Sequence, residues 1–477
     1  MDEEILLVRF EGGGAGSDEL AWGQASFWYC MRDTGQSATM GGVAPVPAGT
    51  TVGELAELLG YLLSRHQSLR TRLEFGPDGQ VRQVCSASGE VPLRVVEAGQ
   101  DDPAPLADRI CQEFAERNFD YRTEWPLRMA VITQHGLATH VVAMYLHLAL
   151  DAGGLAALLA DLADRDRPTS TTARPITALT PLQQARRQRS AAARRQSAAA
   201  LRHLEQVMRG VRPAWFGAPR VGGEATFRMI RYRSPATALA IGRIATHQGV
   251  DAASAMLAMF AVGMARYTGD NPVAAMLMVS NRFRPGFADS VSSVVQISPY
   301  LIDVAGISLA EAVTRAGRSL LHTYKNAYFD PGEQEKLVFR LSRELGRHHD
   351  FCCFYNDRGQ DLGPAAGATA ATDEQLRHAL ARGSWAWEHQ ADMSTRKLFV
   401  SVDSMPDAVE LVMSADSRYF AADDLPALAA TVEAAAVQAA VEPSASAWPQ
   451  SHIEVGGELR AVVCNPRSVL MPPHYQS

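Results

Sequence analysis

The hydrophobic positions of the first half of the chain follow strand and helix periods in turn. Segment 5–10 predicts an opening strand, and 53–65, where apolar residues recur every three and four positions, predicts a helix. Segment 126–150 predicts two strands that turn at His135–Ala138, and the second is apolar on both faces, as in a buried central strand. A helix is expected directly after Gly153 and Gly154. Two further strands are expected in RQVCSA and PLRVVEA, and a helix at 105–118.

The second half repeats this alternation. A Pro-, Thr- and Ser-rich stretch at 164–181 is interpreted as a linker between lobes, and a long, basic, Ala-rich helix is expected to follow it to residue 210. Strands alternating with helices in both halves predict an α/β or α+β fold with lobes at 1–176 and 177–440, and a tail of unknown role at 441–477. The expected helices are 235–247, 251–266, 307–324, 333–345 and 424–440, and the expected strands are 272–280, DFCCFYN, SWAWEHQ, KLFVSVDS and AVELVMSA.

Composition narrows the class of protein. A chain of 477 residues is too long for one ordinary core, and 47% hydrophobic with 20% charged residues is typical of a soluble globular protein. The net charge of −7 provides no attraction to nucleic acid or anionic lipid. The acidic N-terminus lacks the features of a secretory signal, and we find no apolar run of about 18 residues, so a cytoplasmic protein without membrane contact is expected. Six scattered cysteines without CxxC spacing predict no zinc or other metal site.

One local pattern carries possible chemistry. The buried strand ends by placing His147 four residues before Asp151, ahead of two glycines that let the chain turn and leave room for a thin substrate arm. An imidazole, with an ordinary pKa of about 6.5, is well suited to relay a proton at neutral pH. The spacing alone is weak, because it recurs at His247 and Asp251, where the aspartate is expected to cap a helix. The alternative for His147 is a core histidine bonded to a backbone carbonyl.

A series of segments in fixed order resembles the condensation domains of nonribosomal peptide synthetases. The segment most specific to that family is SRHQSLRTRLEF, which is similar to RHExLRTxF, and LHLALDA is similar to HHxxxDG. The similarity spans about residues 18–440. The other segments that carry it are LAWGQASFWYCM, RNFDYRTEWPLRMAVI, SNRFRP, SVVQISPYLIDV, FYNDRG and LVMSADSRYF.

The resemblance implies a fold of two chloramphenicol-acetyltransferase-like lobes in a V-shaped pseudo-dimer with a central tunnel. It makes His147 the catalytic residue and gives Asp151 and Arg282 a structural ion pair at the active site. The implied activity is that of an acyltransferase that forms an amide or ester from a carrier-protein thioester donor and an amine or alcohol acceptor, in secondary-metabolite or antibiotic biosynthesis. No cofactor is bound directly; the phosphopantetheine arm belongs to the carrier protein. No covalent acyl-enzyme is expected, because no activated Ser or Cys is recognisable.

Two positions depart from the family pattern, since Leu146 replaces the first histidine and Ala152 replaces the glycine. Both still fall where the family has its tunnel, and Gly153 and Gly154 would restore space there. Core packing is the alternative for Trp385, which shares a strand face with Trp387, and a turn is the alternative for 356–358. The residues expected to line the tunnel are Leu146, Ala152, Gly153, Gly154, Gln24, Ser298, Tyr355, Asn356 and Trp385.

The basic helix suggests a second partner surface. Arg186, Arg187 and Arg194 are candidates for contact with an acidic carrier protein, and a solvated face with some internal ion pairs is the alternative. Two other functions stay open: a non-catalytic relative that recruits partner enzymes, and an acyl-CoA-dependent transferase of the same fold. Because the two lobes already form a pseudo-dimer, a monomer is expected.

Overall fold

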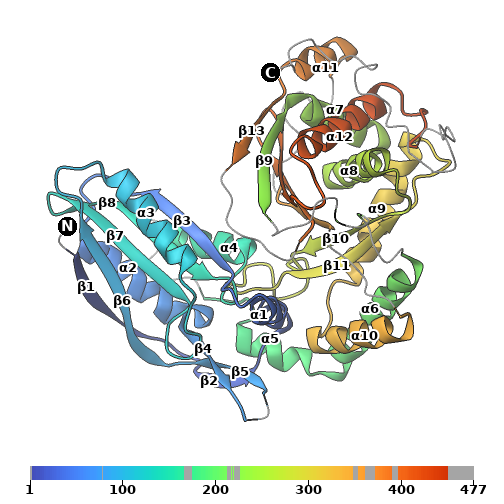
Figure 1. Cartoon of the computed structure of the whole chain (residues 1–477). Helices are drawn as coiled ribbons and strands as arrows, with labels where there is room; N and C mark the ends of the chain where they lie inside the picture. Colours follow the sequence, from blue (N-terminus) through green and yellow to red (C-terminus); the bar gives the residue numbers. More distant parts are fainter. Residues whose placement is uncertain are drawn as a thin grey trace. The chain divides into compact units, whose positions relative to one another are not determined.

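The computed structural model describes residues 3–77, 79–165, 175–211, 216, 219, 226–346, 353–359, 371–388 and 396–448. Contacts divide the chain into two compact units (Figure 1). Unit 1 consists of Met1–Ala198, Ser280–Gln296 and Tyr328–Glu335. Unit 2 consists of Ala199–Val279, Ile297–Ala327 and Lys336–Ser477. These units do not follow the boundary predicted between residues 176 and 177, because segments from the second half of the chain pack within unit 1.

In the described part of unit 1, the main sheet has five strands in the order β1-β6-β7-β8-β3, and a smaller sheet has the order β2-β5-β4. The strands are β1 (Glu3–Glu11), β2 (Gly16–Glu19), β3 (Thr39–Pro45), β4 (Thr71–Phe75), β5 (Val81–Cys85), β6 (Ser88–Glu97), β7 (Leu127–Gln134) and β8 (Leu137–Leu146). The helices are α1 (Trp22–Thr34), α2 (Val52–Arg65), η1 (Gln67–Arg70), α3 (Pro103–Glu116), α4 (Ala152–Arg165) and α5 (Pro181–Gln188).

Strand β7 is the central strand of this sheet, and its alternate residues enter two different cores. Met129 and Val131 pack with apolar residues of α2 and α4, whereas Ala130 and Ile132 pack with α3. The second strand of the hairpin, β8, is an interior strand between β7 and the edge strand β3. Its apolar residues contribute to both of these cores, as expected for a strand that is apolar on both faces, although its first half is only partly buried.

Unit 2 contains, among its described residues, a seven-stranded sheet in the order β11-β10-β12-β14-β15-β9-β13. The strands are β9 (Phe227–Ser234), β10 (Val273–Val279), β11 (Gln296–Ile302), β12 (Cys353–Asp357), β13 (Ser384–Glu388), β14 (Leu398–Ser404) and β15 (Val409–Asp416). The helices are α7 (Pro235–Gln248), α8 (Ala252–Thr268), α9 (Leu309–Lys325), α11 (Asp373–Leu380) and α12 (Asp424–Val441). Helix α10 (Pro331–Glu344) begins in unit 1 and continues in unit 2. Helices α7, α8 and α12 pack together against the sheet.

Helix α12 is long and apolar enough to meet a membrane-span criterion, with a mean hydropathy of 1.2 over 18 residues. The bent pair α7 and α8 meets the same criterion jointly. No apolar run of this length was expected. The apolar face of α12, including Leu428 and Val432, is buried in the core of unit 2, which explains its composition without a bilayer.

The single basic helix predicted from residue 181 to 210 is two helices, α5 and α6 (Ala191–Gly210), and the division between the two units falls within α6. The break lies at Ser190, whose Oγ accepts a hydrogen bond from the main-chain N–H of Ala193 at 3.2 Å. A serine in this position caps a new helix N-terminus, so it interrupts the helical run that the composition favours. Of the linker expected at 164–181, residues 166–174 lie outside the described ranges.

Candidate functional site

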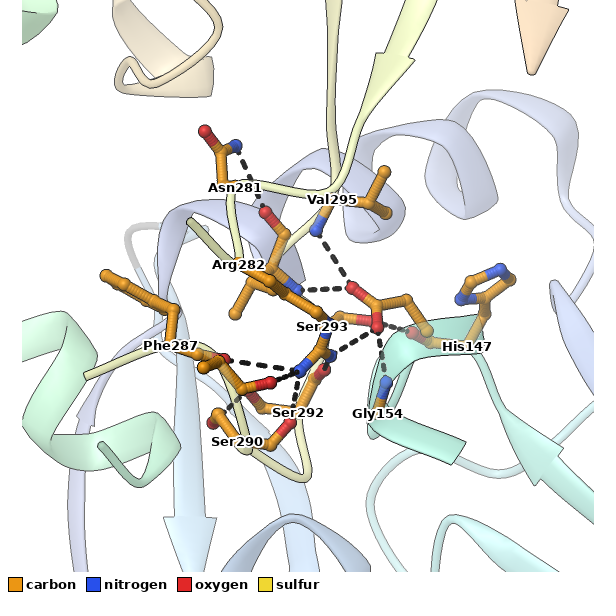
Figure 2. Close-up of polar contacts among 12 residues, drawn as sticks. His147, Gly154, Asn281, Arg282, Phe287, Ser290, Ser292, Ser293 and Val295 are labelled. Carbon is orange, nitrogen blue, oxygen red and sulfur yellow. Dashed lines mark hydrogen bonds and ion pairs between the residues drawn. The ribbon is translucent and has the colours of Figure 1, made fainter. Parts of the chain in front are cut away.

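His147 lies at the turn between strand β8 and helix α4, in unit 1. Its main-chain N–H donates a hydrogen bond of 2.8 Å to the carbonyl of Ala38, and its carbonyl accepts one from the Oγ of Ser293. The imidazole stacks on the ring of Phe27 from α1, with 3.8 Å between centroids and 19° between planes. Figure 2 shows this ring directed away from the polar network that surrounds Arg282. The backbone of His147 is therefore fixed at both its amide and its carbonyl.

Asp151 anchors the start of α4 and joins it to a loop 140 residues further along the chain. The residue is 4% exposed. The carboxylate accepts hydrogen bonds from Gly154 N at 2.7 Å, Val294 N at 2.8 Å and Val295 N at 3.0 Å, and from Arg282 Nη2 at 2.5 Å. These partners occupy both carboxylate oxygens, so Asp151 acts as a structural acceptor at the site.

Arg282 completes this network from the other side (Figure 2). Its guanidinium donates to the main-chain carbonyls of Phe287 at 3.3 Å, Ala288 at 3.1 Å, Ser290 at 2.9 Å and Ser292 at 3.1 Å. One side chain thus holds the loop in shape and pairs with the aspartate. The predicted ion pair between Asp151 and Arg282 is present, with both side chains largely buried.

The two glycines after Asp151 allow the close approach of Arg282 and its loop, and a substrate contact for them stays a prediction. A Cβ atom on Gly153 would lie 2.1 Å from Arg282 Nε, and one on Gly154 would lie 2.8 Å from the carbonyl oxygen of Ser292. The space beside both residues is therefore filled by the arginine and its loop. Ala152, in contrast, is exposed at the first position of α4.

Two other residues predicted to line a tunnel have internal roles in unit 1. Leu146 is 3% exposed and packs in a core cluster with Met31 and Phe119. Gln24 is 1% exposed, and its Oε1 accepts a hydrogen bond of 3.0 Å from the N–H of Ala21, which caps the start of α1. Both side chains are explained by packing and capping within the unit, and a substrate contact for either stays a prediction.

The predicted tunnel residues of the second half belong to unit 2. Ser298 on β11 and Tyr355 on β12 are 1% and 2% exposed, and burial raises the pKa of Tyr355 well above its usual value. Asn356 is a residue of β12 paired with Ser401, so the turn expected at 356–358 begins later than proposed. A substrate contact for these residues stays a prediction.

Trp385 and Trp387 lie on the edge strand β13. They are 37% and 46% exposed, so the core-packing alternative is wrong for them. Trp385 is paired with Tyr232 and Trp387 with Ile230 on the neighbouring strand β9. Paired residues of adjacent strands project from the same face of a sheet, so the two tryptophans lie on the face that carries the buried Tyr232 and Ile230. Their exposure follows from the position of β13 at the end of the sheet.

The arginines proposed to contact a carrier protein are partly engaged within unit 1. Arg186 forms a 3.4 Å ion pair with Asp18, and Arg187 donates a 2.8 Å hydrogen bond to the carbonyl of Pro285. Arg194 is exposed on α6. All three arginines are exposed, and the ion pair of Arg186 agrees with the alternative of a solvated face with internal ion pairs.

Sequence reasoning missed Phe27 and Ser293, although both lie in segments that carried the family resemblance. Neither residue type signals chemistry, because a phenylalanine at helical spacing predicts core packing and a serine predicts a cap or turn. At the second occurrence of the spacing, His247 and Asp251, the aspartate caps a helix as expected. Its carboxylate accepts a 2.7 Å hydrogen bond from Ser254 N at the start of α8. Within the described ranges, no cluster of three or more His, Cys, Asp or Glu side chains is positioned to hold a metal.

A family model for the condensation domain matches residues 39–348, more than half of the chain. The chain belongs to the condensation domain family. Condensation domains are acyl-transferring domains that form amide or ester bonds on carrier-bound substrates in nonribosomal peptide synthesis. The resemblance inferred from the motifs is thereby confirmed.

A curated relative is the AMB antimetabolite synthetase AmbB of Pseudomonas aeruginosa. It is 26% identical over 301 residues, which cover 60% of this chain and 23% of the relative. The match therefore spans less than a quarter of that synthetase's length.

Solved structures show the same fold over nearly the whole chain. The first condensation domain of the calcium-dependent antibiotic synthetase, bound to a substrate analogue, has a TM-score of 0.66 and 15% identity, covering 91% of this chain and 98% of that one. SgcC5 from Streptomyces globisporus has a TM-score of 0.65 and 18% identity, covering 90% and 100%. The X-domain in complex with OxyB from teicoplanin biosynthesis has a TM-score of 0.66 and 16% identity, covering 92% and 96%. The predicted α/β fold class is confirmed.

Proposed function

We propose that this condensation domain is a catalytically active acyltransferase with His147 at its reaction centre. The donor is an acyl or aminoacyl group held as a thioester on the phosphopantetheine arm of an acyl or peptidyl carrier protein. The acceptor is a small-molecule amine or alcohol, and the product is an amide or ester in secondary-metabolite biosynthesis. The supporting observation is that, at one turn, Asp151 and Arg282 form structural hydrogen bonds with each other and with the loop, while the His147 imidazole points away from them.

The reaction is a simple acyl exchange. The nitrogen or oxygen of the acceptor attacks the thioester carbonyl, a C–N or C–O bond forms, and the C–S bond breaks to release the thiol of the phosphopantetheine arm. The proton lost by the nucleophile is the one that the leaving sulfur gains. His147 either relays this proton or holds the nucleophile and stabilises the developing charge. In both cases its side chain must keep a fixed place relative to the donor carbonyl.

A pair of histidine variants tests the proposal. His147→Ala is expected to lower product formation by at least about 100-fold, the usual contribution of a positioned acid–base group, with an unchanged melting temperature. His247→Ala is the matched control, because His247 has the same spacing to an aspartate but is exposed on α7. It should behave as wild type. Product should be measured by mass spectrometry with carrier-loaded donor and a panel of amines and alcohols. Full turnover by His147→Ala would remove the catalytic assignment.

A recruitment function is the second candidate. Leu146 and Ala152 depart from the family motif, and one protein of this fold is an X-domain solved in complex with OxyB. Tight binding of a carrier protein or an oxygenase, together with no turnover of any acyl thioester by the wild-type chain, would favour it. A third candidate, a transferase that uses acyl-CoA, is separated in the same assay by offering one acyl group on CoA and on a carrier protein.

A further inference from the structure

We infer that Phe27 is a positioning residue that sets the plane of the His147 imidazole, and that helix α1 reaches this place because residue 23 is glycine. The inference deepens the proposed function and rests on it for its effect on catalysis. Its structural part concerns geometry alone and can be measured without any turnover.

The first step is the stacking contact itself. The rings of Phe27 and His147 are 3.8 Å apart and nearly parallel, at 19°. Rotation about the last side-chain bond of a histidine is broad and poorly defined by its own torsional preference. The main-chain bonds of His147 to Ala38 and Ser293 fix where the side chain begins but do not act on this rotation. The flat ring of Phe27, packed parallel to one face of the imidazole, restricts the rotation and helps to define the plane of the ring.

The second step explains how α1 brings Phe27 there. Gly23 and Phe27 are four residues apart, so both lie on the same face of the helix. A Cβ atom on Gly23 would lie 2.2 Å from the carbonyl oxygen of Ser293, which is an impossible contact with backbone. The glycine thus allows α1 to touch the chain at Ser293. One turn later, Phe27 covers the imidazole.

The third step closes the linkage. Ser293, which Gly23 contacts through its backbone, also donates its Oγ hydrogen bond to the carbonyl of His147. The same short segment, 292–295, carries the main-chain groups that bind Asp151 and Arg282. Helix α1, the 292–295 segment and the β8–α4 turn are therefore held together around one histidine.

Helix α1 has anchors of its own, so Phe27 can be replaced without losing the helix. The main-chain N–H of Trp22 donates a 2.9 Å hydrogen bond to Gln188 Oε1. The indole ring of Trp22 packs on the ring of Tyr328, with 4.6 Å between the ring centroids. The N-terminal turn is capped by Gln24. Phe27 itself is only partly buried.

The experiment compares Phe27→Leu with the conservative Phe27→Tyr. In protein labelled with 13Cε1-histidine, the Hε1 resonance of His147, assigned by its loss in His147→Ala, should be shifted upfield by the ring current of residue 27. The shift should persist in Phe27→Tyr and disappear in Phe27→Leu. We expect kcat to fall about tenfold in Phe27→Leu, within the range that a small misplacement causes, while KM stays within about twofold and Phe27→Tyr restores kcat. An unchanged resonance in Phe27→Leu would overturn the stacking role, and an unchanged kcat would overturn its catalytic consequence.

A second pair of variants tests the glycine. Gly23→Ala should move α1, abolish the upfield shift and lower kcat in the same way as Phe27→Leu. Gly53→Ala is the matched control, since Gly53 also lies in a helix but its added Cβ would meet only Thr51 Oγ1 at 3.9 Å. It should leave both readouts unchanged. A wild-type resonance in Gly23→Ala would show that α1 does not depend on this close approach. If His147→Ala keeps full turnover while the resonance behaves as described, the proposed function fails and the positioning geometry stands.

Discussion

The carboxylate of Asp151 forms an ion pair with the guanidinium of Arg282 next to Gly153. Arg282 lies over Gly153 and at the same time donates to four carbonyls of its own loop. Removing one partner of such a pair leaves a buried charge without compensation, which costs more than the pair itself contributes. The conformation of the turn that carries His147 is thus stabilised by two residues, Asp151 and Arg282, to which we assign no part in the reaction.

Arg282→Ala should lower the free energy of unfolding by roughly 3–5 kcal/mol, because Asp151 would keep its charge in a buried place without its cation. Denaturant unfolding followed by circular dichroism measures this change. Arg187→Ala is the control, since that exposed arginine donates to a single loop carbonyl and its loss should cost little. Equal stabilities for Arg282→Ala and wild type would contradict the role assigned to the pair.

Gly153→Ala should destabilise the protein by about 1–3 kcal/mol, because the new methyl group must displace the Arg282 side chain. The neighbouring variant Ala152→Gly restores the residue that the family motif has there. Its free energy of unfolding should change by no more than about 1 kcal/mol, the helix propensity difference, because Ala152 is exposed. Thermal denaturation of the two variants side by side decides between packing at 153 and substrate passage as the reason for glycine.

At the scale of elements, a single capping residue, Ser190, determines where one helix ends and the next begins, which the composition of the segment does not indicate. The Ala- and Arg-rich sequence from 181 onward favours a continuous helix, yet Ser190 ends α5 and begins α6.

Ser190→Ala should lower the free energy of unfolding by about 1 kcal/mol through the loss of the N-cap of α6. Ser190→Asn keeps a side-chain acceptor and should retain most of the stability. Both are measured by urea denaturation at constant pH. If alanine proved as stable as serine, the break between the helices would need another cause.

At the scale of the whole molecule, one carboxyl group in each unit has a shifted pKa, and the two shifts run in opposite directions. In unit 1, burial acts to raise the pKa of Asp161, but hydrogen bonds from His66 and Arg65 outweigh it and hold that pKa well below its usual range. Its contribution to stability is present above the unfolded pKa of about 4 and is lost as the pH falls. In unit 2, burial raises the pKa of Asp357 to about 6. That carboxyl favours the folded state when protonated, so its contribution is present below about pH 4 and is lost as the pH rises through 6.

Asp357→Asn should remove the decrease in folding stability that the Asp357 carboxyl causes as the pH rises through about 6. Relative to wild type, the variant should gain stability between pH 4 and pH 7, by up to about 3 kcal/mol for a pKa difference of about two. An asparagine can still accept the 2.9 Å hydrogen bond from Gly359 N. The free energy of unfolding measured every half pH unit tests the window. A constant difference across that range would contradict the raised pKa.

The family motifs, the fold class and most helices and strands could be predicted from the sequence, because they depend on residues that are close together in the chain. The turn after a long apolar strand identified His147, and the family pattern paired Asp151 with Arg282 across 131 positions. The exposed tryptophans of β13 show the limit of such patterns. Alternation assigns Trp385 a face of the strand, but only the order of strands in the sheet decides whether anything covers that face.

For His147, the sequence by itself determined a histidine at the end of an apolar strand, followed by a capped helix in a recognisable family motif. The tertiary structure decided what surrounds it: Phe27 on one side, Ser293 at its carbonyl, and an arginine in the space that two glycines leave. Local patterns report hydrophobic period, turn chemistry and capping, which act within about one helical turn. Ring stacking and close backbone approach depend on distances between segments more than a hundred residues apart, and these exist only once the chain has folded.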